Sequence, residues 1–410
     1  MTVYRRSGTR RAVGLVLSVA CATALAACGS SGGGSGAKSS GASSKGAIRI
    51  GVLAPLTGSV ASDGQDMLKS TQLLVDQVNA TGGIAGRKLE VVSADDACAA
   101  QQGTQAAQKL AISKVVAVVG GFCSSASLPA EAIFKRTNNL PFLISVSSNP
   151  ELTSASNTNV TRYIGRDDEE APIEVAYLEN VLHARKIAIM NDGTAYSQSV
   201  SQQLSKDLGQ SSTAKVVYNG GITPGGNDYR AQLVRVQNSG ADALIYPGFY
   251  AEFGVIAKEW KQANMSFALV GGDSTIDPSV ATTAPDAVSD PKFSQIAYPT
   301  LAQLSNPEAS AFQTAFVKKY GSQPGTYGIF QADATEGLIA ALKATNGATD
   351  AATLNAALRK VSFTGITGQI SFNDIGDRVA PPFVALRASV GGPLAEVASY
   401  SSATGWTATN

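Results

Sequence analysis

Short apolar runs alternate with amphipathic stretches along most of the chain. Val115–Val119 is an unbroken apolar run of β-branched and small residues, which is typical of a strand buried on both faces. The pair Gly120–Gly121 allows a turn, and Ser124, Ser125 or Ser127 is placed to start a helix by accepting from its free N–H groups. Such a helix start suits a small anion such as a carboxylate, although an ordinary capped helix explains the same residues equally well.

The same alternation predicts two successive α/β units with parallel, doubly wound sheets. The first unit is expected to contain the strands Ile48–Ala54, Leu89–Ala94, Val115–Val119 and Pro141–Ser145, with helices Asp63–Asn79, Ala99–Ile112 and a third ending near Thr137. The second is expected to run from an extended segment at Thr161–Gly165 through strands Lys186–Met190, Lys215–Tyr218, Ala243–Tyr246 and Phe267–Val270. Helices Glu308–Tyr320, Phe330–Thr345 and Ala351–Lys360 and strands Gly368–Phe372 and Pro382–Ala388 are expected to follow.

The first 28 residues carry a targeting signal. Arg5–Arg11 is a positive segment, and the apolar stretch Ala12–Ala26 is too short to span a bilayer. The residues Leu25–Cys28 resemble the lipobox of bacterial lipoproteins, which implies cleavage before Cys28 and acylation of its thiol. We therefore expect a signal peptide over residues 1–27 and a lipidated cysteine with a flexible Gly/Ser linker over residues 28–46. A plain secretory peptide is the alternative.

Charge and cysteine content further narrow the possible partners and the possible kinds of site. The formal net charge is +1, and loss of the four arginines of residues 1–27 leaves −3, which argues against a nucleic-acid partner. Outside the cytoplasm, the remaining cysteines Cys98 and Cys123 are expected to form a disulfide. Two cysteines and one distant histidine, His183, make a poor metal site, and we expect no metal or cofactor.

Two acidic segments have plain structural interpretations. Asp167–Glu170 is interpreted as a set of acids that favour a helix start, rather than as a carboxylate cluster with a function. Asn373–Asp377 has oxygen-bearing side chains but lacks a full calcium-loop pattern, so it is interpreted as a turn.

Four motifs occur in an order that resembles a known family. They are Asn79–Arg87, Asp95–Cys98, Gly121–Ser125 and Asn149–Thr153. The region Ile48–Ala388 is similar to the extracytoplasmic binding proteins of branched-chain amino-acid ABC importers. This resemblance implies two lobes joined by three crossings, with a ligand in the cleft between them. Lobe 1 would comprise residues 47–165 and 300–372, and lobe 2 residues 166–299 and 373–410.

The resemblance also assigns ligand contacts residue by residue. Ser124, with Ser125 beside it, would hold a carboxylate, and Ser148 would meet both carboxylate and ammonium. The backbone carbonyl of either Val146 or Ser147 would accept from the ammonium, whose charge partner would be Asp273. The remaining contacts implied for the ligand are those of Tyr196 and Phe249 in lobe 2, of Tyr327 in the side-chain pocket, and of Asp63, where the family has an aromatic residue.

The targeting signal and the family resemblance together imply a lipid-anchored, extracytoplasmic, monomeric protein that captures an amino acid and delivers it to an ABC permease. An enzyme is not expected: a serine hydrolase using Ser124 or Ser125 would need a base, and His183 is the only histidine. No phosphate-binding GxxxxGK[ST] motif is present. The alternatives that stay open are an amide, urea or aromatic-acid ligand, and ligand sensing for a signalling partner.

Overall fold

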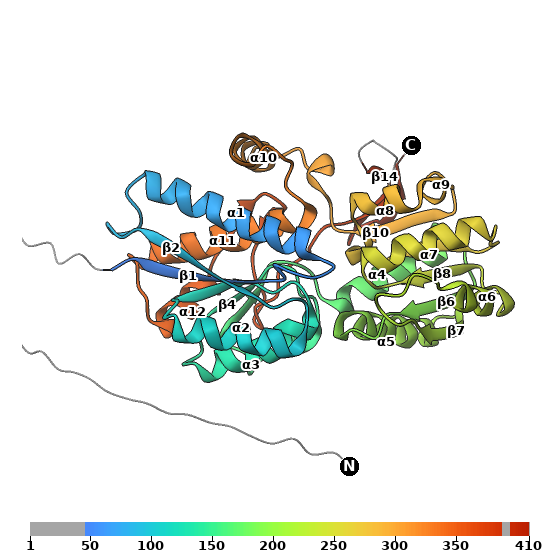
Figure 1. Ribbon diagram of the computed structural model, residues 1–410, viewed down its shortest axis with the longest axis horizontal. Coiled ribbons are helices and arrows are strands. Elements are labelled where there is room, and N and C mark those ends of the chain that lie inside the picture. Colours follow the sequence, from blue (N-terminus) through green and yellow to red (C-terminus); the bar gives the residue numbers. More distant parts are fainter. Residues whose placement is uncertain (1–45, 388–393, 410) are drawn as a thin grey trace, which may run out of the picture. The chain divides into compact units, whose positions relative to one another are not determined.

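The computed structural model describes residues 46–387 and 394–409, and within them the chain forms two α/β lobes (Figure 1). Each lobe is built on its own largely parallel sheet, so the predicted fold class is confirmed. The signal peptide, Cys28 and nearly all of the linker lie outside the described residues. None of the described helices combines the length and hydrophobicity needed to cross a bilayer.

Lobe 1 contains a five-stranded parallel sheet in the order β2-β1-β3-β4-β5. Both faces of this sheet are covered, because Leu53 and Val118 pack toward one set of helices while Val52 and Val119 belong to the core on the other side. This burial on both faces explains the nearly continuous apolar runs. The strands are β1 (Ile48–Ala54), β2 (Leu89–Asp95), β3 (Ala117–Gly120), β4 (Phe142–Ile144) and β5 (Val160–Arg162).

The helices of lobe 1 lie in two layers. Helices α1 (Ala61–Ala80) and α11 (Thr326–Ala344) pack together on one face of the sheet, and α2 (Ala100–Ile112) and α3 (Ser124–Arg136) pack together on the other (Figure 1). Lobe 1 also contains α10 (Pro307–Tyr320), α12 (Ala351–Leu358), the short helix η1 (Pro150–Leu152) and the hairpin of β11 (Phe363–Gly365) and β12 (Gly368–Ile370).

Lobe 2 contains an eight-stranded sheet in the order β15-β14-β13-β10-β9-β8-β6-β7. The five strands from β7 to β10 are parallel, as predicted, but β13, β14 and β15 pair antiparallel. A purely parallel sheet was therefore the wrong expectation at this edge. The strands are β6 (Lys186–Asn191), β7 (Lys215–Gly221), β8 (Ala243–Tyr246), β9 (Ala268–Gly271), β10 (Phe293–Ala297), β13 (Phe383–Arg387), β14 (Ala395–Ser401) and β15 (Gly405–Ala408).

Most helices of lobe 2 follow one of its parallel strands, whereas α4 precedes the first of them, β6. α4 packs against α5, and α7 packs against α6, α8 and α9. Their bounds are α4 (Asp167–Asn180), α5 (Ala195–Gln210), α6 (Arg230–Asn238), α7 (Tyr250–Gln262), α8 (Pro278–Thr283) and α9 (Pro285–Val288), with η2 at Asp273–Thr275.

The chain passes between the two sheets three times, at residues 163–166, 298–306 and 371–382. The second crossing contains η3 (Leu301–Gln303). The first and third are joined by backbone bonds from Arg162 N to Gly376 O (2.8 Å) and from Arg378 N to Arg162 O (3.1 Å). Asn373 begins the predicted turn, accepting at its Oδ1 from the N–H groups of Ile375 and Asp377.

Candidate functional site

The turn between β3 and α3 is the first part of the candidate site. Gly120 and Gly121 have φ values of +138° and +80°, a region that only glycine adopts readily. A Cβ on Gly120 would lie 2.1 Å from the Leu53 carbonyl oxygen, so glycine is required there. The turn brings the start of α3 to the carboxyl edge of the sheet, where open α/β folds bind ligands.

Helix α3 begins at Ser124, as expected, but no serine hydroxyl caps it. The N-cap residue is Cys123, which makes no side-chain capping bond. The Oγ of Ser124 is buried and has no hydrogen-bond partner among the described residues. The predicted serine cap is therefore wrong, and this hydroxyl and the first N–H groups of α3 are suited to an anion from outside the chain.

The other predicted serines make internal bonds. Ser125 Oγ accepts from Ala195 N (3.2 Å) at the start of α5, so it connects the two lobes. Ser147 Oγ lies 2.6 Å from Ser127 Oγ, and the Ser147 carbonyl accepts from Arg162 Nη1 (3.0 Å). The neighbouring Val146 and Ser148 are also buried, at 4% and 3% exposure.

Asp273 lies at the corresponding edge of the second sheet, just after β9, with 2% of its surface exposed. Its carboxylate accepts from Tyr196 Oη and from Ser274 N, and its backbone carbonyl accepts from Tyr327 Oη (2.9 Å). Burial raises the pKa of Asp273 above its usual value. Because Tyr327 comes from α11 of lobe 1, this tyrosine directly joins the two lobes at the predicted ammonium partner.

Aromatic rings from both lobes meet beside Asp273. Phe122 lies against Phe249 (centroids 6.2 Å apart) and Tyr327 (5.1 Å), and Phe249 also contacts Tyr196 (5.8 Å). Tyr196, Phe249, Asp273 and Tyr327 are thus brought into one cluster. Phe122 was not among the predicted site residues, although its place between Gly121 and Ser124 was a usable signal.

Three further carboxyl groups lie in the interior near Asp273. Asp167, Glu170 and Glu174 of α4 are all fully buried, and none of their carboxyl oxygens has a hydrogen-bond partner among the described residues. Burial raises the pKa of Asp167 to about 6 and those of Glu170 and Glu174 well above the usual range, with the Asp273 charge adding to each shift. Asp167 and Glu170 do lie in the first turn of α4, as predicted, but their complete burial was not predicted.

Asp63 provides a separate buried acid in lobe 1. It lies in the first turn of α1 with 8% exposure, and its Oδ2 has no hydrogen-bond partner among the described residues. Burial raises its pKa to about 8, with further contributions from the charges of Asp277 and Asp66. Over the described ranges, no group of three or more His, Cys, Asp and Glu residues is arranged to hold a metal ion.

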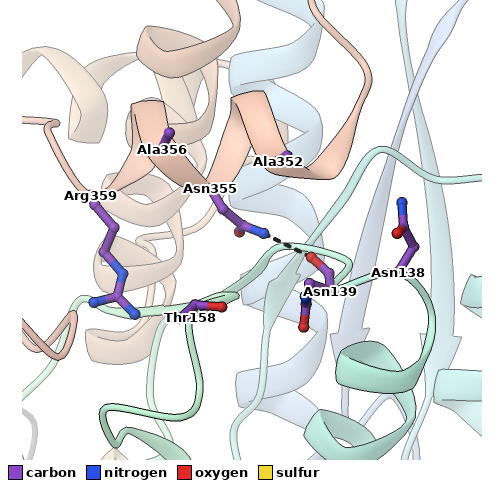
Figure 2. A pocket seen from close by; sticks show the side chains of 7 residues that line it. All are labelled: Asn138, Asn139, Thr158, Ala352, Asn355, Ala356 and Arg359. Atoms are coloured by element: carbon purple, nitrogen blue, oxygen red, sulfur yellow. Dashed lines mark hydrogen bonds between the residues drawn. The ribbon is translucent and has the colours of Figure 1, made fainter.

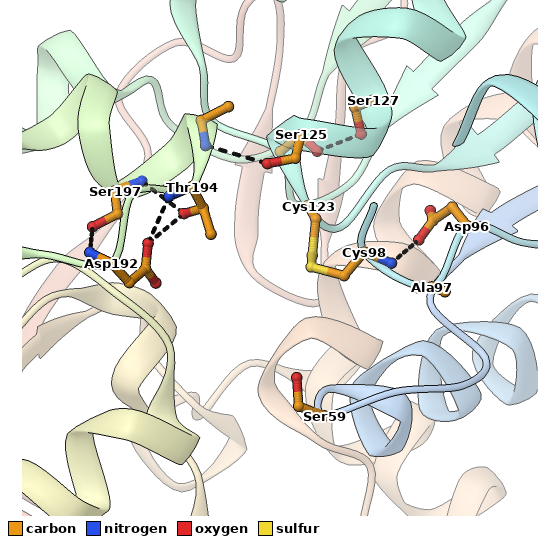
Figure 3. Close-up of a disulfide and its surroundings, with 12 residues drawn as sticks. Ser59, Asp96, Ala97, Cys98, Cys123, Ser125, Ser127, Asp192, Thr194 and Ser197 are labelled. Carbon is orange, nitrogen blue, oxygen red and sulfur yellow. Dashed lines mark hydrogen bonds between the residues drawn. A yellow bond between two sulfur atoms is a disulfide. The ribbon is translucent and has the colours of Figure 1, made fainter. Parts of the chain in front are cut away.

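The predicted disulfide between Cys98 and Cys123 is present, with Cα atoms 5.2 Å apart (Figure 3). It ties the loop after β2 to the residue before α3, and Asp96 Oδ1 supports that loop by accepting from Cys98 N (2.9 Å). Figure 3 also shows Ser125 directed toward the start of α5, where Thr194 accepts from Ser197 N. The disulfide therefore fixes the position of the α3 start.

A surface pocket of about 420 Å³ lies elsewhere in lobe 1 (Figure 2). Asn138, Asn139 and Arg359 are among its lining residues, and Asn355 Nδ2 donates to Asn139 O (2.8 Å). This pocket adjoins the C-terminal end of α3, whereas Ser124 begins that helix, and a helix of 13 residues is about 20 Å long. The pocket is therefore separate from the candidate site.

Comparison with known proteins identifies the family. The family model for periplasmic binding proteins matches residues 47–392, so this chain belongs to the periplasmic binding protein family. The chain is 28% identical over 339 residues to the "Amino acid binding protein" of Pseudomonas aeruginosa, covering 82% of this chain and 88% of that protein. It is 29% identical to the "Leu/Ile/Val-binding protein BraC3" of Rhizobium johnstonii, covering 82% and 90%.

Solved structures share the fold. The leucine-binding protein LivK of Thermotoga maritima superimposes with a TM-score of 0.79 at 22% identity, covering 87% of this chain and 99% of that chain. An ABC-transporter solute-binding protein of R. palustris, solved in complex with benzoate, has a TM-score of 0.77 at 20% identity, covering 88% and 98%. These likenesses agree with the two-lobed architecture built on separate sheets.

Proposed function

We propose that this chain captures an amino acid, branched-chain or related, between its lobes and delivers it to the permease of an ABC importer. The N-terminal lipid at Cys28 would keep the binding lobes at the outer surface of the membrane. The observation that carries the proposal is that a bare helix start, with Ser124, and a buried acid, Asp273, occur at the carboxyl edges of the two sheets.

The two ends of a zwitterionic ligand need different partners, because each charge loses several kcal/mol of hydration when it leaves water. The start of α3 and the hydroxyls of Ser124 and Ser148 would hold the carboxylate. Asp273 would pair with the ammonium, and the Val146 carbonyl is the better second acceptor because that of Ser147 already accepts from Arg162. The aromatic cluster would exclude water.

Ligand binding would favour the closed arrangement, because only that arrangement presents both sets of contacts. Several hydrogen bonds between the lobes accompany the arrangement seen in this structure, and three of them involve residues of or near the candidate site. These three are Ala195 N to Ser125 Oγ (3.2 Å), Tyr250 Oη to Ser59 O (2.9 Å) and Tyr327 Oη to Asp273 O (2.9 Å). A permease that contacts both lobes would recognise this closed form.

A thermal-shift screen of the full chain in detergent tests the proposal. The ligands are amino acids, amides, urea and aromatic acids, with benzoate included because of the aromatic cluster. A ligand at 100 times its Kd should stabilise the folded chain by about 2.7 kcal/mol.

Asp273→Asn should abolish the shift with amino acids, because it removes the charge partner of the ammonium. Asp286→Asn, an exposed acid of the same lobe, is the matched control and should respond like the wild type. An Asp273→Asn variant that responds normally to the same amino acid would contradict the ammonium assignment.

A further inference from the structure

Asp63 is a buried acid that forms no ion pair with any lysine or arginine of the described residues. It faces acids and neutral groups: Asp66 lies on its own helix, Asp277 comes from lobe 2, and Gly325 is at the start of α11. The neighbouring cation Lys69 pairs with Asp66 at 3.0 Å. A carboxylate in this position must therefore hold a proton or meet a positive charge from outside the chain.

Asp63 also lies where the two lobes meet. Tyr250, from α7 of lobe 2, reaches the first turn of α1, where its Oη donates to Ser59 O (2.9 Å) and lies 3.2 Å from Ser62 Oγ. Asp63 and Asp277 both act on the pKa of that tyrosine. The acid is thus at the junction between the lobes rather than inside the core of one of them.

Tyr327 connects this acid to the predicted ammonium site. A Cβ on Gly325, two residues before it, would lie 3.9 Å from Asp63 Oδ1, and Tyr327 Oη donates to Asp273 O (2.9 Å). Burial raises the pKa of Tyr327 above its ordinary value, and the charges of Asp273 and Asp63 add to this shift. Asp63 therefore lies beside the backbone two residues before Tyr327, and Asp273 lies beside the Tyr327 hydroxyl.

The two arginines at the first crossing, Arg162 and Arg166, are paired with other acids. Arg162 pairs with Asp377 at 2.8 Å, and Arg166 pairs with Asp168 at 2.7 Å and with Asp377 at 2.9 Å. A ligand with one ammonium and one carboxylate brings no net charge and would leave Asp63 uncompensated. A ligand with a second cation would compensate it.

We propose that the ligand carries two cationic nitrogens, as a basic amino acid does, with its first nitrogen on Asp273 and its second on Asp63. This inference rests on the proposed function and narrows its substrate class. Ser124 Oγ is buried and has no hydrogen-bond partner among the described residues, which independently indicates that the ligand also brings an acceptor and favours a basic amino acid over a simple diamine.

Matched ligand pairs test the second cation without any mutation. Calorimetry of the full chain in detergent would compare lysine with norleucine and ornithine with norvaline, because each pair differs only by the terminal amine. The better basic ligand should bind at least tenfold more tightly than its neutral partner, about 1.4 kcal/mol. Equal or tighter binding of the neutral partners would overturn the inference while leaving the proposed function intact, whereas no binding by any amino acid would overturn both.

Two variants locate the second cation. Asp63→Asn should remove the preference, so that the basic ligand and its neutral partner bind this variant with affinities within about twofold of each other. Asp76→Asn, an exposed acid on the same helix, should retain the preference. An equal loss for both ligands in Asp63→Asn would overturn the role of Asp63. The last comparison uses putrescine and cadaverine, which carry two amines and no carboxylate. If they bind as tightly as the basic amino acids, two cation sites are supported and the carboxylate role of Ser124 is refuted.

Discussion

Asp377 holds two of the three chain crossings together, and its replacement by asparagine gives the sharpest stability test. Its carboxylate pairs with Arg162 Nε (2.8 Å) and Arg166 Nη1 (2.9 Å) and accepts from Thr153 Oγ1 (2.9 Å). Asp377→Asn keeps the shape of the side chain but removes the charge. Arg162 would then be a buried cation that has lost the one carboxylate with which it pairs directly among the described residues.

The burial of this pair determines the size of the effect. The side chains of Arg162 and Asp377 are 0% and 1% exposed, so water cannot replace the lost partner. Removing one member of such a pair destabilises a protein by about 3–5 kcal/mol. Arg166 contributes less to the loss, because it is 15% exposed and keeps its bond to Asp168.

Urea unfolding followed by circular dichroism measures this loss as a lower transition midpoint at an unchanged slope. Glu90→Gln is the control, because the Arg49–Glu90 pair is 46% and 49% exposed and such surface pairs contribute about 0–1 kcal/mol. A loss below about 1 kcal/mol for Asp377→Asn would refute the reasoning about burial.

Ligand affinity should also fall, since Arg162 Nη1 donates to the carbonyls of Ser147 and Asn149 on either side of Ser148.

Two further predictions concern stability. Replacing both Cys98 and Cys123 by serine should lower the free energy of unfolding by about 3 kcal/mol, because the disulfide closes a loop with a sequence separation of 25 residues. Urea midpoints of the wild type with and without reductant measure this loss. A wild-type midpoint that does not change on reduction would contradict the prediction. The pKa of Asp63, about 8, lies above its unfolded value, so the folded state binds the extra proton and stability should fall as pH rises from about 4 to 8. Asp63→Asn should therefore melt at a higher temperature than the wild type at pH 8 without ligand, and a lower melting temperature would contradict the raised pKa.

Local patterns in the sequence were sufficient for the first four strands of lobe 1 and for the disulfide. Those strands carry short apolar runs and helices α1, α2 and α3 amphipathic ones, so their predicted bounds agree with the observed ones within a few residues. The extended segment expected to open the second unit instead forms β5 of the first sheet, and β11 was not predicted. The β10 strand, Phe293–Ala297, was not predicted because it contains Ser294 and Gln295. Both are buried in the sheet, and Gln295 Nε2 donates to Thr275 O (2.6 Å), a partner that no local pattern reveals.

The charged residues of the site were harder to predict, because their partners are distant in sequence. Acids at a helix start are favourable on local grounds, and nothing between Asp167 and Glu174 indicates that these side chains are directed inward toward Asp273. Asp377 was interpreted as part of a turn, and its partner Arg162 is 215 residues away. Glycines and cysteines were more informative, since backbone freedom and thiol pairing restrict what the surrounding structure can be.

The two kinds of buried acid in this chain can be separated by a single question, namely whether the chain supplies the positive charge. Asp377 has two arginines, so neutralising it should destabilise the protein. Asp63 and Glu174 have no cation among the described residues, and neutralising either should stabilise the free protein, because a carboxylate in the interior is unfavourable without a partner. The change in the free energy of unfolding on neutralisation would thus have opposite signs for acids of nearly equal burial. A loss of stability marks an acid that holds the lobes together, and a gain marks an acid kept for a ligand that brings the missing charge.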